Sequence, residues 1–311
     1  MLPLSNQVYA IFRGGWVLLR SIAVISSSVA TIISSLLPLF LYSSISSDRL
    51  WLLFVFLTIA AFAIHGVLTH AFNDYTDHCS GTDSFSPAIL SGGSRVIQNG
   101  MFSLHAVLKL AFAFTFILLI LALVLAIFAQ YKLVILLLIG IWSAVSYSVS
   151  PLHLSYRPFL GEWASLFPAI FSLGLAGPWL MLNTIPLWAI QNSLINALFC
   201  MAWVMVHHIP DLQADRRALP KKQTSVVWFV ERFGLYYARF PALLYFSFAA
   251  LCMLWLGFDR IWAAGFLLIM LTIAIILVLK MDVTNHEQVS NYEKILLFLA
   301  MLTAVGLGIL V

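Results

Sequence analysis

The chain has 311 residues, of which 62% are hydrophobic and 9% are charged, and its mean hydropathy is +1.02. A water-soluble core cannot enclose that share of apolar side chains, so the composition excludes an ordinary soluble domain and indicates a protein of the lipid bilayer. In such a protein the formal net charge of +4 reports topology and gives no indication of nucleic acid.

Nine apolar stretches are long enough to cross ~30 Å of hydrocarbon as helices. In chain order they are 20–43, 51–72, 104–129, 133–151, 162–183, 187–207, 237–257, 261–280 and 295–311. Their hydrophobicity is continuous and does not alternate with a period of two, which favours helices over a β-barrel. We therefore predict an all-α integral membrane protein with nine transmembrane helices in one bundle, and we expect the first span to be retained and not cleaved as a signal peptide.

Lysine and arginine are divided unequally between the two ends of these spans. With a cytoplasmic N-terminus and alternating helices, thirteen basic residues face the cytoplasm and three, Arg49, Lys132 and Arg260, face the outside. This bias favours that orientation by the positive-inside rule. The two long connections, 73–103 and 208–236, then both lie on the cytoplasmic face of the cell inner (plasma) membrane, where we expect the polar chemistry.

The whole chain, 1–311, is predicted to be a single domain. Its second and sixth spans each run into an acidic motif and then into a long connection. This placement suggests two related halves, helices 1–4 over about 15–155 and helices 5–8 over about 160–280, with a ninth helix added.

The two acidic motifs are NDYTDHCSGTD, which begins at Asn73, and DLQADRR, which begins at Asp211. Asp74 and Asp77 are three residues apart, so they share a face of a helix that continues from the second span. Asp211 and Asp215 are four residues apart and share a face in the same way. Each motif therefore presents a pair of carboxylates at the cytoplasmic end of a span.

Asp83 follows Gly81, where the chain can turn back, and it brings the number of carboxylates at this membrane level to five. Mutual repulsion and desolvation disfavour their charged forms, so a compensating cation is expected. Oxygen ligands without a Cys or His pattern suit a hard cation, and Mg²⁺ is the usual one where phosphate is also bound. The three cysteines lie far apart and form no metal-binding pattern.

Basic residues near the motifs fit a phosphate partner. Arg95 lies in LSGGSRVIQNG, Lys221 and Lys222 follow the second motif, and Arg157 lies on the connection between the fourth and fifth spans. Metal ions can bridge carboxylates to a diphosphate while basic side chains neutralise the remaining charge. One DxxxD pair alone is usually a solvated helix face, and one basic loop usually reflects topology, but two such sets at equivalent places favour a diphosphate site.

NDYTDHCSGTD with the following SGGSRVIQNG resembles the first signature of the UbiA superfamily of intramembrane prenyltransferases, and DLQADRR resembles the second. The nine-helix layout with both motifs on the cytoplasmic face is also similar, so the resemblance covers the whole chain. The GGSR segment and YSVSPLHLSYRPFLGE are most similar to the 1,4-dihydroxy-2-naphthoate polyprenyltransferases of menaquinone biosynthesis. The chain departs from that pattern at His207, His208 and Pro210, in ALPKKQT and around Pro158, which leaves the acceptor open.

The resemblance implies Mg²⁺-dependent transfer of a polyprenyl group from an allylic polyprenyl diphosphate to an aromatic quinone precursor, with release of diphosphate. The residues it implies as metal ligands are Asn73, Asp74, Asp77 and Asp83 for one ion and Asp211 and Asp215 for another. Of these, the residues it implies as catalytic are Asp74, Asp77, Asp211 and Asp215. The residues it implies as diphosphate-binding are Arg95, Lys221, Lys222 and Arg157.

Aromatic and polar residues are expected to stabilise the allylic cation or to bind the acceptor, because π faces attract cations and a dry wall excludes water. The candidates for these roles are Tyr147, Tyr156, Glu162 and His208, with Trp142, Phe167 and Trp203 as further aromatic candidates. We expect His65 and His70 to make hydrogen bonds between helices. The polar segment 281–293 is predicted to be a cytoplasmic loop without chemistry.

Alternative functions keep part of this interpretation. A UbiA-type membrane terpene cyclase, or a prenyltransferase with a non-quinone acceptor, would use the same metal and diphosphate. A transporter with buried carboxylates belongs to a different class and predicts acidic residues in mid-span, whereas here each Asp lies at a predicted helix end or in a loop. The expected partners are the polyprenyl diphosphate donor, an aromatic small-molecule acceptor and the bilayer, without nucleic acid.

Overall fold

The computed structural model describes residues 13–87, 89–182 and 184–311. Within these residues every regular element is a helix, and nine helices are long and apolar enough to cross a membrane. They are Ser21–Tyr42, Ser47–Ser80, Leu104–Ile127, Tyr131–Ser148, Glu162–Met181, Leu187–His207, Leu235–Leu256, Ile261–Lys280 and His286–Ile309. The prediction of an all-α membrane protein with nine spans is confirmed.

Four spans contain more than one helical segment. The first comprises α2 (Ser21–Val24), η1 (Ile25–Val29) and α3 (Ala30–Tyr42), and the second comprises α4 (Ser47–Ala61), η2 (Phe62–Thr69) and α5 (His70–Ser80). The fifth comprises η4 (Glu162–Leu166) and α9 (Phe167–Met181), and the seventh comprises η5 (Leu235–Arg239) and α13 (Phe240–Leu256). The remaining spans are α7 (Leu104–Ile127), α8 (Tyr131–Ser148), α10 (Leu187–His207), α14 (Ile261–Lys280) and α15 (His286–Ile309). The short elements are α6 (Thr82–Phe85), η3 (Leu154–Tyr156), α11 (Leu212–Arg217) and α12 (Ser225–Phe233).

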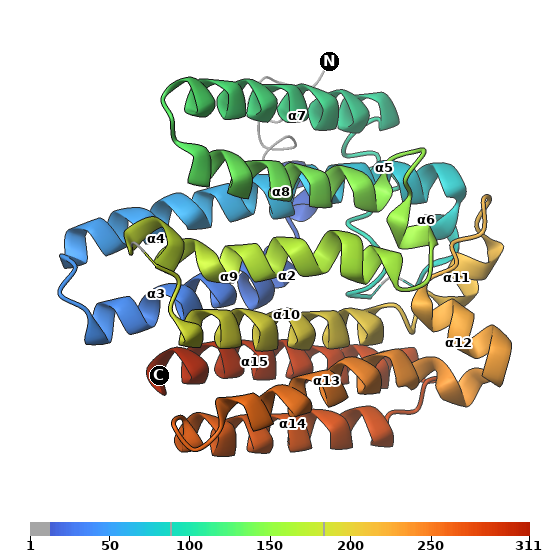
Figure 1. Cartoon of the computed structure of the whole chain (residues 1–311). Helices are drawn as coiled ribbons and strands as arrows, with labels where there is room; N and C mark the ends of the chain where they lie inside the picture. Colours follow the sequence, from blue (N-terminus) through green and yellow to red (C-terminus); the bar gives the residue numbers. More distant parts are fainter. Residues whose placement is uncertain (1–12, 88, 183) are drawn as a thin grey trace.

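The long helices run side by side, with α10 packed against α9, α13 and α15 (Figure 1). Helix α10 is the most buried span, and it bonds to a neighbouring helix through a polar side chain: Asn192 donates to the carbonyl of Leu307 at 2.9 Å. Helix α7 lies on the outside and exposes large apolar side chains such as Phe116 and Ile120. Exposed apolar surface of this kind is what contact with lipid requires.

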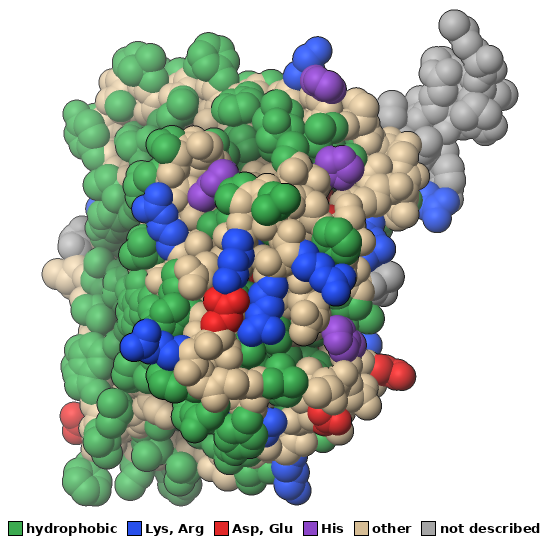
Figure 2. Space-filling view, turned by 90° about the vertical axis from the view of Figure 1, so that its right-hand side faces the viewer, with side chains coloured by type: hydrophobic (Ala, Val, Ile, Leu, Met, Phe, Trp, Pro, Cys, Tyr) green, Lys and Arg blue, Asp and Glu red, His purple; other side chains and the backbone are tan. Residues whose placement is uncertain are grey.

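The connections at the two ends of the bundle differ in length. Elements α6, α11 and α12 gather at one end, whereas short turns such as 43–46 and 128–130 close the other (Figure 1). The end with the long connections carries a concentration of lysine, arginine and histidine side chains (Figure 2). Below, this end is called the polar end. Both acidic motifs lie there.

Two helices extend beyond the apolar spans of the sequence, and for the second span this continuation through Asp74 and Asp77 was predicted. The second span remains helical through the first acidic motif to Ser80, and the ninth begins at His286 and not at residue 295. Asn285 caps the ninth helix, because its side chain accepts a hydrogen bond from the backbone of Gln288 at 3.0 Å. The prediction of a loop over 281–293 was therefore wrong for its second half, which places Glu293 on a helix.

The first two spans each contain a π-helical segment, η1 and η2. Side-chain hydroxyls bond back to backbone carbonyls in both: Ser27 donates to Ala23 at 2.6 Å, and Thr69 donates to Ile64 at 3.1 Å. Such bonds compete with the regular helical ladder. Widened turns of this type often lie at functional sites, and here η1 and η2 both face the cavity described next.

Candidate active site

A cavity of about 900 Å³ begins at the polar end and extends into the bundle. Asp77, Asp211 and Lys222 line its polar part. Further in, its walls are apolar side chains of α4, α7 and α8, among them Phe56 and Leu121. The cavity therefore combines a charged head with a long apolar interior.

The first acidic motif occupies the end of α5. Gly81 ends this helix with a φ of 82°, a left-handed conformation that glycine adopts without strain, and α6 starts directly after it. This reversal buries Asp83, which accepts a hydrogen bond from Gln98 Nε2 at 2.9 Å. The turn expected at Gly81 is present, and it brings Asp83 back toward α5.

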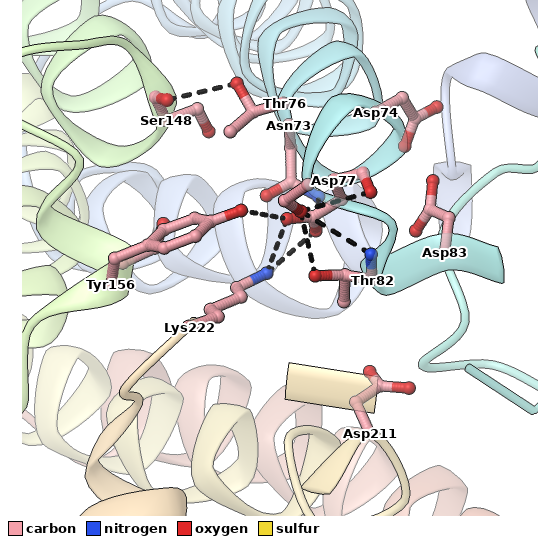
Figure 3. Close-up of polar contacts among 12 residues, drawn as sticks. Asn73, Asp74, Thr76, Asp77, Thr82, Asp83, Ser148, Tyr156, Asp211 and Lys222 are labelled. Carbon is pink, nitrogen blue, oxygen red and sulfur yellow. Dashed lines mark hydrogen bonds and ion pairs between the residues drawn. The ribbon is translucent and has the colours of Figure 1, made fainter. Parts of the chain in front are cut away.

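Asp77 is the centre of the hydrogen-bond network in Figure 3. Lys222 Nζ lies 2.8 and 2.7 Å from its two carboxylate oxygens, and both side chains are less than one tenth exposed. Asn73 donates to the same carboxylate at 3.0 Å, and the Tyr156 hydroxyl donates at 3.3 Å. A buried carboxylate with a buried ammonium is compatible with folding only because each neutralises the other.

One backbone hydrogen bond joins the segments of the two acidic motifs, which are far apart in the sequence, and a second holds the segment after the second motif against that motif. The amide of Leu219 donates to the carbonyl of Ser80 at 2.9 Å, and the amide of Lys222 donates to the carbonyl of Asp215 at 3.0 Å. The first bond ties the segment after α11 to the end of α5. The motifs therefore lie at the same end of the bundle and around the same cavity.

The glycine-rich segment between α6 and α7 contacts both motifs. Ser94 donates to Asp74 through its backbone amide at 3.4 Å and through its hydroxyl, and Ser91 donates to Asp211 at 3.3 Å. Gly93 passes so close to Asp83 that a Cβ would lie 2.8 Å from a carboxylate oxygen. The absence of a side chain at Gly93 is what allows this segment to cover the carboxylates.

The carboxylates of this cluster outside the spans hold their protons more tightly than usual. Burial, reinforced by the charges of Asp77 and Asp74, raises the pKa of Asp83 to about 7. Burial also raises the pKa of Asp211, and it raises that of Asp215 well above its ordinary value. One buried lysine does not compensate this many acids, so an added cation would favour their ionised forms.

For Lys222, unlike these acids, the neighbouring charges outweigh the effect of burial on the pKa. Burial lowers its pKa, but the carboxylates of Asp77 and Asp215 outweigh burial, and the net pKa lies well above the usual value. The side chain therefore stays cationic inside the protein. It is a fixed positive charge at the head of the cavity.

The predicted metal ligands do not form a closed cage in this structure. Over the described residues, no three His, Cys, Asp or Glu side chains are grouped as a ready metal site, because Lys222 binds both oxygens of Asp77 while Ser94 and Gln98 bind Asp74 and Asp83. The donor set nevertheless fits a hard cation, since it consists of carboxylate and amide oxygens. One oxygen of Asp215 is buried without a hydrogen-bond partner in the described part of the chain, as expected for a group that serves an additional ligand.

Lys222 is the one predicted diphosphate-binding side chain that lines the cavity within the described residues. Arg95 adopts a positive φ of 57° and donates to two backbone carbonyls, that of Ser86 at 2.5 Å and that of Gly92 at 3.3 Å. These bonds hold the glycine-rich segment in its folded-back path. Arg95 thus supports the segment that covers the carboxylates.

Arg157 and Lys221 bind groups at the outer surface. Arg157 is exposed and donates to the carbonyl of Pro151 at 3.3 Å. Lys221 forms an ion pair with Glu231 at 2.6 Å, and both side chains are substantially exposed. Their assignment to diphosphate stays a prediction that would require these side chains to turn inward.

Three of the predicted acceptor-binding or cation-stabilising residues, Tyr147, Trp203 and His208, line the cavity. The Tyr147 hydroxyl lies 3.5 Å from Nε2 of His208. Burial lowers the pKa of His208 well below its ordinary value, so its imidazole is neutral. The part of the cavity wall that Tyr147 and His208 form is therefore polar and uncharged.

Tyr156 and Glu162 lie near the polar part of the cavity. Within the described part of the chain, they are not among the side chains that line it. The ring of Tyr156 lies 5.6 Å from Lys222 Nζ, so it contacts the same ammonium that Asp77 binds. Glu162 is buried and accepts a hydrogen bond from Ser225 Oγ at 2.6 Å, and Ser225 also accepts from the backbone of Phe159 at 2.8 Å. Ser225 therefore braces the connection after α8 against α12.

Replacing Ser225 with alanine is expected to lower the free energy of unfolding by roughly 1–3 kcal/mol, because the buried Glu162 carboxylate and the Phe159 amide would lose their partner. Thermal unfolding in detergent measures the effect. Ser247→Ala is the matched control, since Ser247 is exposed and donates only to its own helix. Equal stability of the two variants would refute the bracing role.

Two further aromatic candidates lie elsewhere. Trp142 is 47% exposed and donates to the carbonyl of Ala164 at 2.8 Å. Phe167 stacks on Phe171 with ring centroids 5.4 Å apart. These contacts show that Trp142 and Phe167 take part in packing between helices and within α9.

The two histidines before the first motif behave differently from each other. His65 makes the expected hydrogen bond between helices, to Ser28 at 2.9 Å. His70 bonds instead to the carbonyl of Gly66 in its own span, at 3.0 Å, so the prediction for His70 was wrong. The π-helical path of η2 directs this ring along its own helix.

Several residues that contact the carboxylates or line the cavity were not among the predicted site residues. Ser94 and Gln98 bind acidic side chains, yet small and amide side chains in a glycine-rich loop give little signal. Arg20 and Glu293 also line the cavity. A single glutamate near the start of an apolar span was a usable signal, because an ionisable group in a span suggests a function or a named partner.

The family comparison agrees with this geometry. The model of the UbiA prenyltransferase family matches residues 28–302, which include both acidic motifs and most of every span. No curated protein and no solved structure matches the chain. The matched region forms an all-helical membrane bundle, which has both motifs at one end and a cavity between them. The chain belongs to the UbiA prenyltransferase family and is a membrane prenyltransferase.

Proposed function

We propose that the protein transfers a polyprenyl group from an allylic polyprenyl diphosphate to an aromatic quinone precursor, with 1,4-dihydroxy-2-naphthoate as the favoured acceptor, and releases diphosphate. The observation that carries this proposal is the cavity of about 900 Å³, with Asp77, Asp211 and Lys222 at its head and apolar side chains beyond. A polyprenyl diphosphate has the same division into a polyanionic head and a long apolar tail.

Magnesium would be held by oxygens of the two motifs, and when bound it would make diphosphate a better leaving group by withdrawing charge from its oxygens. The residues proposed to hold it are Asn73, Asp74, Asp77 and Asp83 in the first motif and Asp211 and Asp215 in the second. The orphaned oxygen of Asp215 and the excess of buried acid support this assignment.

Lys222 supplies a fixed positive charge that neutralises the departing diphosphate. Its ammonium now binds Asp77, so it is already oriented toward the place where the diphosphate head would lie. Such preorganised charge costs no rearrangement at the moment of reaction. Arg95, Arg157 and Lys221 are proposed to act on the diphosphate only after their present contacts are exchanged.

The allylic carbon, once its bond to oxygen breaks, must be kept from water until the acceptor ring attacks it. Trp203 and Tyr147 line the cavity, and their π systems are proposed to stabilise the cation. Burial of these walls excludes water from the developing cation. We assign the apolar part of the cavity, which reaches Phe56 and Leu121, to the prenyl tail.

Product analysis by mass spectrometry tests the proposal. The purified protein is incubated with Mg²⁺ and prenyl diphosphates of several chain lengths, together with 1,4-dihydroxy-2-naphthoate, with 4-hydroxybenzoate or with no acceptor. A prenylated naphthalene product is expected, and its formation should stop with a metal chelator and resume with added Mg²⁺. Diphosphate release without an acceptor, together with a cyclic hydrocarbon or alcohol, would instead favour a terpene cyclase.

We also propose that the polar end faces the cytoplasm of the inner (plasma) membrane. Cys79 is exposed at this end, whereas Cys200 is buried and Cys252 is only partly accessible within α13. A membrane-impermeant maleimide is therefore expected to label inverted membrane vesicles at Cys79 and to leave right-side-out vesicles unlabelled. Loss of the signal in Cys79→Ser identifies the site, and labelling confined to right-side-out vesicles would refute the orientation.

A further inference from the structure

A second polar group lies on the cavity wall beside the two acidic motifs. It consists of Arg20 at the start of the first span, His207 at the end of α10 and Glu293 on α15, all of which line the cavity. His207 Nδ1 lies 2.6 Å from a carboxylate oxygen of Glu293, and His207 Nε2 lies 3.2 Å from the Arg20 guanidinium. Three spans distant in sequence therefore contribute one continuous chain of side chains.

The direction of the hydrogen bonds in this chain follows from what each group can donate. A guanidinium has only N–H donors, so Nε2 of His207 must accept from Arg20. The proton of the ring is then on Nδ1, which donates to Glu293. His207 is thus a neutral link between a buried anion and a cation, and it separates their charges without cancelling either of them.

Glu293 has unused binding capacity. Its side chain is fully buried, and its second carboxylate oxygen has no hydrogen-bond partner among the residues the structure describes. A buried carboxylate oxygen without a partner is costly, so a bound group that satisfies this oxygen would be stabilised there. Because a carboxylate only accepts, the ligand group at this oxygen must be a donor such as a hydroxyl.

Within the part of the chain that the structure describes, Arg20 has unused hydrogen-bond donors. It donates to the carbonyl of Leu90 at 3.2 Å and to His207, but a guanidinium carries five N–H donors in a flat fork. The donors left over suit a carboxylate or carbonyl oxygen. This part of the cavity wall therefore offers a hydrogen-bond acceptor on Glu293 and hydrogen-bond donors on Arg20. The aromatic ring of Trp203 lies nearby, with its centroid 6.3 Å from that of the His207 ring.

We propose that Arg20 and Glu293 form the acceptor subsite of this enzyme and that its ligand is an aromatic acid bearing a ring hydroxyl. The hydroxyl donates to the free oxygen of Glu293, the acid group accepts from Arg20, and His207 holds the two side chains in register. This inference rests on the proposed prenyl transfer, because it supplies the second substrate. The negative charge of Glu293 disfavours diphosphate here, which keeps the donor head at Lys222.

Binding of three probes to the wild-type protein in nanodiscs, without any prenyl donor, tests the subsite. The probes are 4-hydroxy-2-naphthoate, whose hydroxyl is too far from its own carboxylate to bond to it, 4-methoxy-2-naphthoate, which cannot donate, and 1-naphthol, which lacks the acid, and each is followed by its own fluorescence. The first is expected to bind about tenfold or more tightly than either of the others, as the loss of one hydrogen bond to a charged partner implies. Equal affinity for the three probes overturns the proposal.

Two variants separate recognition from a structural role. Glu293→Gln is expected to lose the preference for hydroxy over methoxy, and Arg20→Gln is expected to lose the preference for the acid over naphthol, while each keeps the other preference. Glu287→Gln is the matched control on the same helix, because Glu287 is exposed, and it should bind like the wild type. A uniform loss of all probes in both variants would mean a merely structural role and overturn the assignment.

These measurements need no turnover, so they separate the subsite from the proposed reaction. Discrimination among the probes without any prenylated product supports the subsite and refutes the transfer. Prenylated product together with a wild type that does not discriminate supports the transfer and refutes the subsite.

Discussion

Alanine in place of Asp74 or Asp211 is expected to reduce prenyl transfer by about 100-fold or more while leaving a folded, membrane-inserted protein. Each carboxylate is proposed to hold a metal that stabilises the departing diphosphate, and loss of one preorganised electrostatic contact typically costs a factor of this size. Folding should survive, because the substitution removes a buried acid that is costly to ionise. Diphosphate release per unit of purified protein measures the effect.

Asp282→Ala is the control for these two variants. Asp282 is fully exposed in the turn before α15 and bonds locally to Thr284 at 2.7 Å. Its replacement should leave turnover unchanged. Wild-type activity in Asp74→Ala or Asp211→Ala would contradict the assignment of the site, whereas loss of activity in Asp282→Ala would show that the assay responds to general damage.

Methionine in place of Lys222 is expected to lower both stability and turnover. Removing one partner of a buried ion pair leaves the other charge uncompensated, which typically costs about 3–5 kcal/mol, although protonation of Asp77 would relieve part of that cost. Turnover should fall by about 100-fold, because the departing diphosphate loses its fixed cation. Thermal unfolding and diphosphate release in the same preparation measure the two effects.

Lys221→Met is the matched control, because the two lysines are neighbours in the chain with opposite environments. Lys221 is 43% exposed and pairs with a partly exposed glutamate, Glu231, and such surface pairs contribute only about 0–1 kcal/mol. Its replacement should change stability little. Equal effects of the two substitutions would refute the view that the buried pair of Lys222 and Asp77 organises the site.

Much of the bundle could be predicted from hydrophobicity, because a bilayer imposes a minimum length on each span and requires satisfied backbone hydrogen bonds. The predicted ends of the helices were less accurate where the helices extend beyond the hydrocarbon. Residues 73–80 and 286–293 are polar, so a hydropathy window ends before them, yet both segments continue as helices. Hydrogen bonding along the helix does not stop where the apolar run stops.

The acidic motifs were recognisable because charge is rare in this chain and their spacing places carboxylates on one helix face. The partners of those carboxylates were not recognisable. Ser91, Ser94 and Gln98 reach them from a loop, and loop paths depend on turns that short-range patterns describe poorly. Lys221 and Lys222 look equivalent in sequence, but only burial against α5 distinguishes them.

By itself the sequence determined that the chain is a helical membrane protein with nine spans, and it located the two acidic motifs and their resemblance to intramembrane prenyltransferases. These features follow from composition, segment length and local spacing, which act within a few turns of helix. Only the tertiary structure decided that Lys222 closes on Asp77, that Glu293 joins His207 and Arg20, and that the other basic candidates face elsewhere. Those contacts join residues up to 187 positions apart, and the distance between such residues is set by how the helices pack.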